Sequence, residues 1–430
     1  MKILFLTSNY LPNPSANGIN TMNIINDLEK RGHFVSCICV ASDSNDLNRE
    51  IIGKTDIIRV SKSHFSEILE LNTEKSTYNK IIVKINIIFR RILNMLKIYN
   101  FPSFDQTQNK KVYNKAREVL SENDYDCIIG IFKPYSNIYS LLKLKKNNKK
   151  LFVIAYFLDL LSSINKPKFM PRKLYENLIK KEYLRILNCV DGLLVPENSN
   201  EEIGMNHLLG DLKTRIVNYP TFLDQNDTES IKEKNINICE ELNLIYAGTL
   251  DEQYRNPKKA LEFLFNLSKS GWKINLDIYG KNNCQEIISQ FNKDNFRINI
   301  KGLKTHEEII NKMKKADYLV NISNQNINAI PSKIFEMFSL ARPIINFVEK
   351  SNDITLQYFN RYPSNINVFV NNTFKDNKYQ FEKFVKENKN TEINKKELKN
   401  IYFKNTPEHT ANQILELIGE DYVSNKKRKY

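Results

Sequence analysis

The chain has 430 residues, of which 41% are hydrophobic and 26% charged, with a formal net charge of +15. This length and composition are typical of a globular protein with two domains of about 200 residues each. No apolar run approaches the roughly 18 residues of a membrane span, and residues 1–6 form too short a stretch for a secretory signal. No two glycines are spaced G-x-G, which excludes the usual dinucleotide loop. The six cysteines are scattered, so we expect reduced thiols and a cytoplasmic protein.

Strands and helices alternate along the first half. The sequence predicts a buried strand at 2–7, a loop with two prolines at 9–18, a helix at 19–31 and a strand at 33–40. Further predicted elements are strands at 126–131, 151–156 and 192–195, with a helix at 171–188 before the last of them. Short apolar strands separated by helices indicate a parallel sheet that is buried on both faces.

A polar stretch at 224–241 interrupts this alternation, which then starts again. Strands are predicted at 242–247, 273–279, 296–300, 318–322 and 343–348, and helices begin near Pro257, Thr305 and Ser332. The residues from Thr305 to Glu308 form a capping box at the start of the second of these helices. We therefore expect an amino-terminal domain at 1–225, a linker at 226–241, a second domain at 242–405, and a helix with a basic tail at 406–430. Two doubly wound sheets that face a central cleft would bind ligands at the carboxyl ends of their strands.

A candidate anion site lies in the second half, at Pro331-Ser332-Lys333. Ser332 is positioned to cap a helix whose first N–H groups would attract an anion, and Lys333 adds a full positive charge. Glu336 lies one turn further on, where a carboxylate could accept hydrogen bonds from two ribose hydroxyls. The alternative is an ordinary capped helix with a solvated lysine and a first-turn glutamate.

A second candidate in this half is the loop after the strand at 242–247. Gly248 and Thr249 stand at the carboxyl end of that strand, and Arg255 comes just before the next helix. Gly248 would let a ligand approach the backbone, and the planar fork of Arg255 is suited to a diphosphate. Lys258 is a weaker candidate for the same role. An ordinary surface position is the alternative for Arg255.

These motifs resemble the donor half of GT-B glycosyltransferases of the family 4 type. The resemblance rests on Tyr246-Ala247-Gly248-Thr249-Leu250 with Arg255-Asn256-Pro257, and on the stretch from Pro331 to Met337 with Arg342-Pro343. In the first half, Asn17-Gly18 before a helix and Arg31-Gly32-His33-Phe34-Val35 after it are also similar to the family pattern. One departure is Asn328, because the family commonly has a glutamate at that position.

The resemblance implies two Rossmann-like domains in the GT-B arrangement, acceptor side first. It also implies a metal-independent transfer of a sugar, with retention, from a nucleotide-diphosphate sugar. Arg255 and Lys333 would hold the diphosphate and neutralise the leaving group, as a divalent ion does elsewhere. Gly18, Gly248, Thr249, Ser332 and Glu336 would complete the donor site. The expected product is a cell-surface polysaccharide such as a capsule or lipopolysaccharide.

Asp159 is the candidate catalytic residue of the first half. It follows the strand at 151–156, where a carboxylate could accept the proton of the acceptor hydroxyl or bind acceptor hydroxyls. The resemblance supports a polar residue there, although many relatives carry histidine. The alternative is an aspartate that caps the next loop.

The stretch from Tyr78 to Tyr99 reads as a basic amphipathic helix. Lys80, Lys84, Arg90 and Arg91 are interleaved with many isoleucines, which is typical of a helix lying in an anionic membrane surface. The sequence therefore predicts a cytoplasmic protein at the inner face of the membrane with a saccharide or lipid-linked acceptor. The alternative for this helix is packing on its own domain with the basic face in water.

Three other functions compete with sugar transfer. An inactive GT-B subunit that scaffolds a partner transferase is favoured by Asn328. A GT-B epimerase or phosphorylase-like enzyme would need other acidic residues or the sequence context of a cofactor-binding lysine, and we find neither in the sequence. A nucleic-acid binder is suggested by charge alone, but no aromatic-basic RNA motif or zinc finger supports it, so no nucleic acid is expected. The sequence leaves the base, sugar, acceptor and linkage open.

Overall fold

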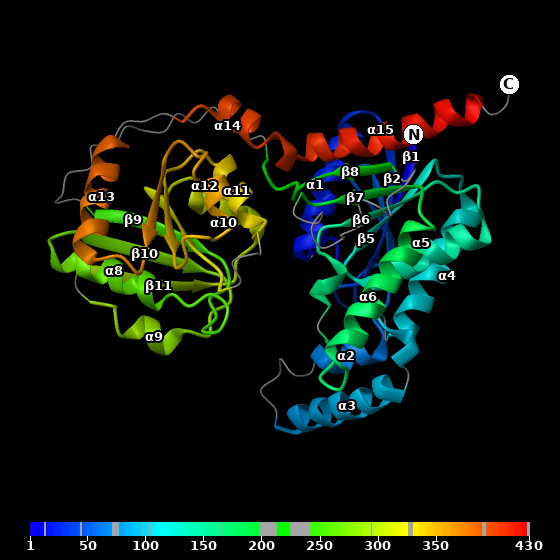
Figure 1. Ribbon diagram of the computed structural model, residues 1–430, viewed down its shortest axis with the longest axis horizontal. Helices are drawn as coiled ribbons and strands as arrows, with labels where there is room; N and C mark the ends of the chain where they lie inside the picture. Colours follow the sequence, from blue (N-terminus) through cyan, green and yellow to red (C-terminus); the bar gives the residue numbers. More distant parts are fainter. Residues whose placement is uncertain are drawn as a thin grey trace. The chain divides into compact units, whose positions relative to one another are not determined.

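Two compact units make up the chain. The computed structural model describes residues 1–430 except 13, 44, 71–76, 97, 103–104, 165, 198–212, 224–240, 294, 326–329, 389–392 and 428–430. Met1–Pro220 and Lys404–Tyr430 form the first unit, and Thr221–Phe403 form the second (Figure 1). Most of the expected linker at 226–241 lies outside the described residues.

An eight-stranded sheet forms the centre of the described part of the first unit, in the order β3-β4-β2-β1-β5-β6-β7-β8. Its neighbours are parallel, except that β3 runs antiparallel to β4. The strands are β1 (Lys2–Leu6), β2 (Phe34–Val40), β3 (Arg49–Ile52), β4 (Thr55–Val60), β5 (Cys127–Phe132), β6 (Val153–Phe157), β7 (Gly192–Val195) and β8 (Lys213–Ile216).

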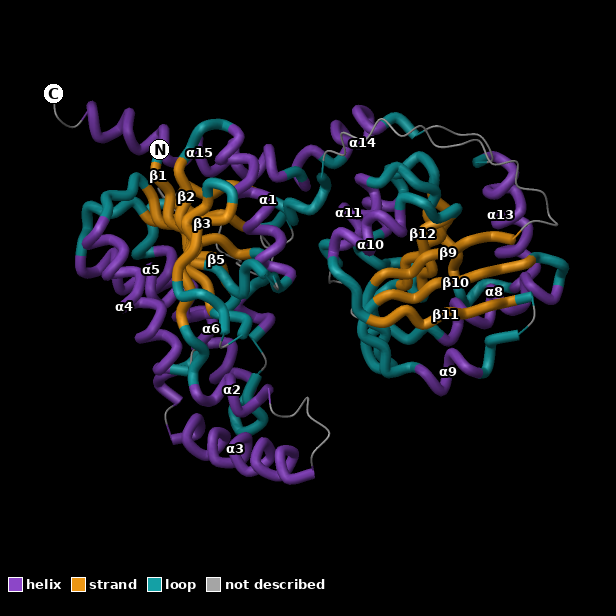
Figure 2. The backbone as a smooth tube through the Cα atoms, turned by 180° about the vertical axis from the view of Figure 1, so that it is seen from behind, coloured by secondary structure: helices purple, strands orange, loops and turns teal. Residues whose placement is uncertain are grey.

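Helices cover both faces of this sheet, as the apolar strands predict (Figure 2). The described helices of this unit are α1 (Ala16–Lys30), α2 (His64–Glu70), α3 (Thr77–Leu96), α4 (Gln106–Glu122), α5 (Tyr135–Asn147), α6 (Arg172–Leu187) and α15 (Pro407–Lys427). Residues of α1 and α15 pack in one apolar cluster on the sheet, and residues of α4, α5 and α6 pack in another. The expected doubly wound architecture is confirmed for this unit.

The helix that was expected at 406–430 belongs to the first unit. Ile414 and Leu417 of α15 are fully buried against the same cluster as Phe5 of β1. A side chain at Gly192 would lie 3.2 Å from Leu417, so the glycine lets α15 approach β7 closely. The carboxyl-terminal segment therefore completes the core of the amino-terminal unit.

The described part of the second unit holds a six-stranded parallel sheet in the order β11-β10-β9-β12-β13-β14. Its strands are β9 (Glu241–Ala247), β10 (Lys273–Tyr279), β11 (Phe296–Gly302), β12 (Tyr318–Ile322), β13 (Ile344–Val348) and β14 (Asn365–Phe369). Its helices are α8 (Lys258–Lys269), α9 (Gln285–Ser289), α10 (His306–Met313), α11 (Lys333–Ser339), α12 (Leu356–Phe359), α13 (Phe374–Glu387) and α14 (Lys395–Ile401). The restart of the strand–helix alternation is confirmed.

The two faces of this sheet differ in chemistry. One face packs apolar side chains against α8 and α13. The other carries a row of amides in which Asn321 donates to Asn346, and Asn346 to Asn367, each over 2.8 Å. α10, α11 and α12 lie together in the second unit (Figure 1). The Phe338 ring of α11 stacks on Tyr402 with ring centroids 4.6 Å apart, which anchors the helix that begins at Lys333.

Candidate functional site

The winding direction of the second sheet reverses between β9 and β12. β10 and β11 extend the sheet on one side of β9, whereas β12, β13 and β14 extend it on the other. Ligands of open α/β sheets bind at the carboxyl ends of the strands beside such a switch point. The segments that start there are the loop from Gly248 to Pro257 and the segment after Ile322.

Gly248 and Arg255 lie against each other at this switch point. A Cβ atom at Gly248 would stand 2.8 Å from the Tyr246 hydroxyl and 3.4 Å from a guanidinium nitrogen of Arg255. Burial raises the pKa of Tyr246, while the neighbouring Arg255 lowers it. A side chain at this position would therefore collide with the Tyr246 hydroxyl, which itself interacts with the Arg255 guanidinium.

The loop that carries Arg255 is held at several points. The backbones of Asp251 and Arg255 bond to each other in both directions, at 3.2 and 2.8 Å. Hydrogen bonds from Asn283 and from two backbone N–H groups lower the pKa of the Asp251 carboxyl. Arg255 also donates through Nε to Asn324 Oδ1 over 2.9 Å, which links the loop to the end of β12. The side chain is thus positioned rather than free in solvent, unlike an ordinary surface arginine.

Lys333 brings a second cation to the same place. Its Nζ donates to the carbonyl oxygen of Ala247, the last residue of β9, over 3.2 Å. Burial lowers the pKa of Lys333; nearby Glu336 raises it, and Arg255 lowers it further. Two cations that disfavour each other in a desolvated position would both be stabilised by a shared anion.

Glu336 is buried, and its carboxylate forms an ion pair with His306. The imidazole lies at the start of α10, which the expected capping box of Thr305 and Glu308 opens. The hydrogen bond to Glu336 raises the pKa of His306, although burial opposes this. His306 is a site residue that sequence reasoning missed, because 30 residues separate it from Glu336 and the capping motif explained its neighbours.

Two expected details of the helix at Lys333 differ in the structure. The Ser332 side chain makes no capping hydrogen bond, and its carbonyl oxygen accepts a bond from the Thr221 hydroxyl over 2.7 Å. The N–H groups of Ile334 and Phe335 donate to the carbonyl oxygens of Pro331 and Ser332 in a tight first turn. Two N–H groups of that turn are therefore already bonded, and the side chains of Lys333 and Arg255 bring full positive charges to the same place.

Of the two remaining residues of the expected donor half, the structure describes Thr249 but not Asn328. Thr249 is exposed, and its carbonyl oxygen accepts a hydrogen bond from the Tyr246 hydroxyl over 3.0 Å. Asn328 lies outside the described residues. The structure thus brings together Gly248, Arg255, Lys333 and Glu336, and adds His306.

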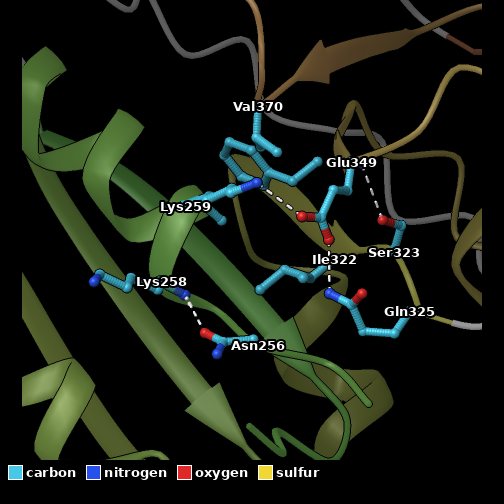
Figure 3. Close-up of a pocket in the computed structure, with 10 residues that line it drawn as sticks. Asn256, Lys258, Lys259, Ile322, Ser323, Gln325, Glu349 and Val370 are labelled. Atoms are coloured by element: carbon cyan, nitrogen blue, oxygen red, sulfur yellow. Dashed lines mark hydrogen bonds and ion pairs between the residues drawn. The ribbon is translucent and has the colours of Figure 1, made fainter. Parts of the chain in front are cut away.

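A pocket of about 160 Å³ lies beside this constellation but is not formed by it. It opens between the start of α8 and the ends of β12 and β13, and Glu349 bridges Lys259 and Gln325 across it, at 2.7 and 2.6 Å (Figure 3). Lys258, the weaker diphosphate candidate, lines this pocket, whereas Arg255, Lys333 and Glu336 do not.

In the first unit the reversal falls between β1 and β5. Asp159, after β6, pairs with Lys133, after β5, with 3.8 Å between the charged atoms and both side chains about two-fifths exposed. Asn17 Nδ2 donates to the Lys133 carbonyl oxygen over 3.4 Å. Lys133 is a polar neighbour of Asp159 that the sequence analysis did not select.

We expected Gly18 just before a helix, but it lies inside the first turn of α1. Its N–H donates to the hydroxyl of Ser15, which caps α1. A Cβ atom at Gly18 would stand 2.0 Å from the Asn9 carbonyl oxygen, so the glycine allows the loop after β1 to fold onto the helix. This packing accounts for the glycine within the first unit.

The expected membrane-contact residues divide into two groups. Lys84 and Arg91 are exposed on α3, and the side chain of Lys80 lies outside the described residues. Arg90 instead faces the protein. Its guanidinium lies 3.5 Å from the centre of the Phe65 ring and 3.8 Å from the Asp105 carboxylate.

The described residues contain neither a membrane-spanning helix nor a metal-binding cluster. None of the helices in this part of the chain is long and apolar enough to cross a bilayer. Within the same residues, no three or more histidine, cysteine, aspartate or glutamate side chains are grouped so that they could hold a metal ion.

The solved structures similar to this chain include WaaG, a glycosyltransferase involved in lipopolysaccharide biosynthesis, in a match that covers 95% of this chain and 98% of WaaG with a TM-score of 0.53 and 12% identity. Sucrose-phosphate synthase from Thermosynechococcus elongatus matches 98% of this chain and 99% of its own, with a TM-score of 0.59 and 11% identity. The match to TarM covers 97% of this chain and 98% of TarM, with a TM-score of 0.58 and 12% identity. The match to HepE of Anabaena, in complex with UDP and glucose, covers 98% of this chain and 100% of HepE, with a TM-score of 0.55 and 10% identity. No family model and no curated protein sequence matches the chain.

The chain therefore has the GT-B fold, as its sequence motifs implied. The agreement extends over nearly the full length of both chains in each comparison, and it includes both α/β units. At identities of 10–12% this likeness concerns the fold.

Proposed function

We propose that this protein is a glycosyltransferase that uses a nucleotide-diphosphate sugar as donor. The observation that carries the proposal is the convergence of Arg255 and Lys333 on the end of β9, beside Gly248. These two cations lie at the switch point of the second sheet, and ligands of open α/β sheets generally bind beside such a point. HepE, a similar structure, is in complex with UDP and glucose, which supports a nucleotide-sugar donor here.

The proposed reaction forms a bond from an acceptor hydroxyl oxygen to the anomeric carbon and breaks the bond from that carbon to the diphosphate. Negative charge then develops on the leaving nucleoside diphosphate. Arg255 and Lys333 would stabilise that charge through fixed hydrogen-bond donors, without a metal ion. The proton of the acceptor hydroxyl would pass to the Asp159 carboxylate. By resemblance, the configuration at the anomeric carbon is retained.

Glu336 would bind the ribose hydroxyls of the donor. A buried carboxylate accepts hydrogen bonds from a diol in the same way as it accepts one from an imidazole. The ribose would therefore share Glu336 with His306. The proposed acceptor is a saccharide or lipid-linked saccharide of a cell-surface polysaccharide, bound on the side of Asp159, Lys133 and Asn17.

A panel of UDP-, GDP- and other sugar nucleotides tests this function. Release of nucleoside diphosphate is measured with and without a pool of saccharide acceptors. We expect turnover with one donor class, and its loss in Lys333→Ala and Glu336→Ala. Lys312→Ala and Glu307→Ala are matched controls, because both residues are exposed on α10 and outside the site. Equal turnover in all four variants would reject the assignment. If the protein neither binds nor turns over any donor of the panel, that result would favour a non-catalytic GT-B scaffold.

A further inference from the structure

The helix α3 exposes a continuous apolar stripe. Seven large side chains on it are each between 52% and 70% exposed. They are Ile81, Ile85, Ile88, Phe89, Ile92, Met95 and Leu96. Figure 1 and Figure 2 show α3 at the edge of the first unit, beside α2 and away from the sheet. Contiguous exposed apolar surface of this kind marks a site of interaction.

The stripe follows from the spacing of its residues. At about 100° per residue, the seven side chains span about 120° of the helix circumference. Lys84 and Arg91 fall within about 40° of one edge of the stripe. We call these two residues the basic border. Both are exposed, so the charges are in water beside the apolar surface.

The opposite side of α3 is attached to the first unit. Val83 is fully buried there, and the Arg90 guanidinium lies over Phe65 of α2 and near Asp105 at the start of α4. These contacts fix the rotation of the helix about its own axis. The stripe is therefore directed outward by the attachment of the inner side.

We propose that α3 lies in the surface of an anionic lipid bilayer, with the stripe among the acyl chains and the basic border at the headgroups. An interfacial helix combines a wide apolar face with lysines and arginines at its edge. Residues Thr77–Leu96 include no aspartate or glutamate, so nothing on the helix repels anionic headgroups. The net charge of +15 acts in the same direction.

A second copy of this chain fits the stripe less well than a bilayer does. Pairing two stripes would bring each basic border to a helix without acidic residues. The charges of Lys84 and Arg91 would then lack partners on the facing helix, whereas an anionic membrane supplies them. This inference does not depend on sugar transfer, since lipid binding is measured without donor or acceptor.

Flotation of the full-length protein with vesicles tests the proposal. We expect binding to phosphatidylcholine vesicles that contain phosphatidylglycerol, weaker binding to phosphatidylcholine alone, and weakening with salt. Ile85→Gln with Ile88→Gln and Ile92→Gln should reduce binding at least about tenfold, since glutamine keeps the helix but not the apolar surface. Lys84→Gln with Arg91→Gln should abolish the preference for phosphatidylglycerol.

A matched control replaces apolar residues elsewhere on the first unit. Phe34→Gln with Ile51→Gln removes two side chains that are 72% and 73% exposed but lie outside α3, and binding should be unchanged. Failure of the unaltered protein to bind phosphatidylglycerol vesicles would overturn the proposal, as would equal binding by the triple variant. A dimer in light scattering that the triple variant converts to monomer would assign the stripe to a second copy.

Discussion

The imidazole of His306 and the buried carboxylate of Glu336 form an ion pair between α10 and α11. The pair fixes the carboxylate that we propose for the donor ribose, one turn after Lys333. It also couples the carboxylate to the protonation of His306, whose pKa is raised chiefly by its hydrogen bond to Glu336.

The contribution of this pair to stability should depend on pH. Because Glu336 raises the pKa of His306 in the folded protein, the stabilisation is complete below about 6.5 and is lost as the pH rises through the raised value. His306→Gln should therefore lower the melting temperature more in acid than in alkali. The loss in acid should correspond to about 1–3 kcal/mol, the cost of an unsatisfied buried group. Thermal unfolding across the pH range measures this.

His409 provides a control of opposite sign. Burial lowers its pKa, so the unfolded chain binds its proton more readily and acid destabilises the folded state through this residue. His409→Gln should therefore lessen the loss of stability in acid. Parallel pH profiles for the two histidine variants would contradict the assignment of the raised pKa to His306.

Much of this architecture was predictable from the sequence, because buried parallel strands read as short apolar runs between helices. The cap at Thr305 was predictable as well, since four consecutive residues determine it. The His306–Glu336 and Lys133–Asp159 pairs were not, because the fold brings together residues that are far apart in the chain. Arg90 shows another limit. Its place on the helix was clear, but its orientation depends on Phe65 and Asp105.

Gly248→Ala should weaken nucleotide binding without unfolding the protein. The added methyl group would meet the Tyr246 hydroxyl at 2.8 Å, and a shift of that hydroxyl would disturb the Arg255 guanidinium with which it interacts. We expect roughly a tenfold loss of affinity for a nucleoside diphosphate, the equivalent of about 1.4 kcal/mol. Calorimetric titration measures it. Adding Tyr246→Phe should recover part of the affinity, and no recovery would argue against this steric cause.

Gly18→Ala should instead reduce stability. A methyl group there would lie 2.0 Å from the Asn9 carbonyl oxygen, a backbone atom that can move only with its loop. We expect a loss of about 2–4 kcal/mol, measured by denaturant unfolding. Gly419→Ala is the matched control, because no atom lies within 4 Å of its added Cβ. Equal stability of the two variants would show that the loop after β1 adjusts freely.

Binding of a nucleoside diphosphate should weaken at alkaline pH through Lys333. Burial lowers the pKa of its ammonium group below 10.5, so the charge is lost earlier than on an exposed lysine. Lys333→Arg keeps a charge at every accessible pH. We expect the affinity of this variant to be less dependent on pH above neutrality, as measured by calorimetry. A shared alkaline decline would place the titrating group elsewhere.

Asp159→Asn should reduce turnover with acceptor without changing the affinity for the donor nucleotide. The amide cannot accept the proton of the acceptor hydroxyl, so turnover with acceptor should fall about 10²-fold or more. Affinity for the nucleoside diphosphate should remain unchanged, because Asp159 has no proposed role in donor binding. Steady-state kinetics and calorimetry on the same preparation test both parts. Loss of nucleotide affinity would assign Asp159 to the donor instead.

The most direct test of the account is the affinity of Lys333→Ala for a nucleoside diphosphate. UDP, GDP and ADP are titrated into the unaltered protein and into the variant, with Lys312→Ala as control. We predict saturable binding of at least one of them to the unaltered protein and to the control. We also predict at least about tenfold weaker binding to Lys333→Ala, as expected when a charge-assisted contact is removed. Equal dissociation constants for all three proteins would contradict the central claim.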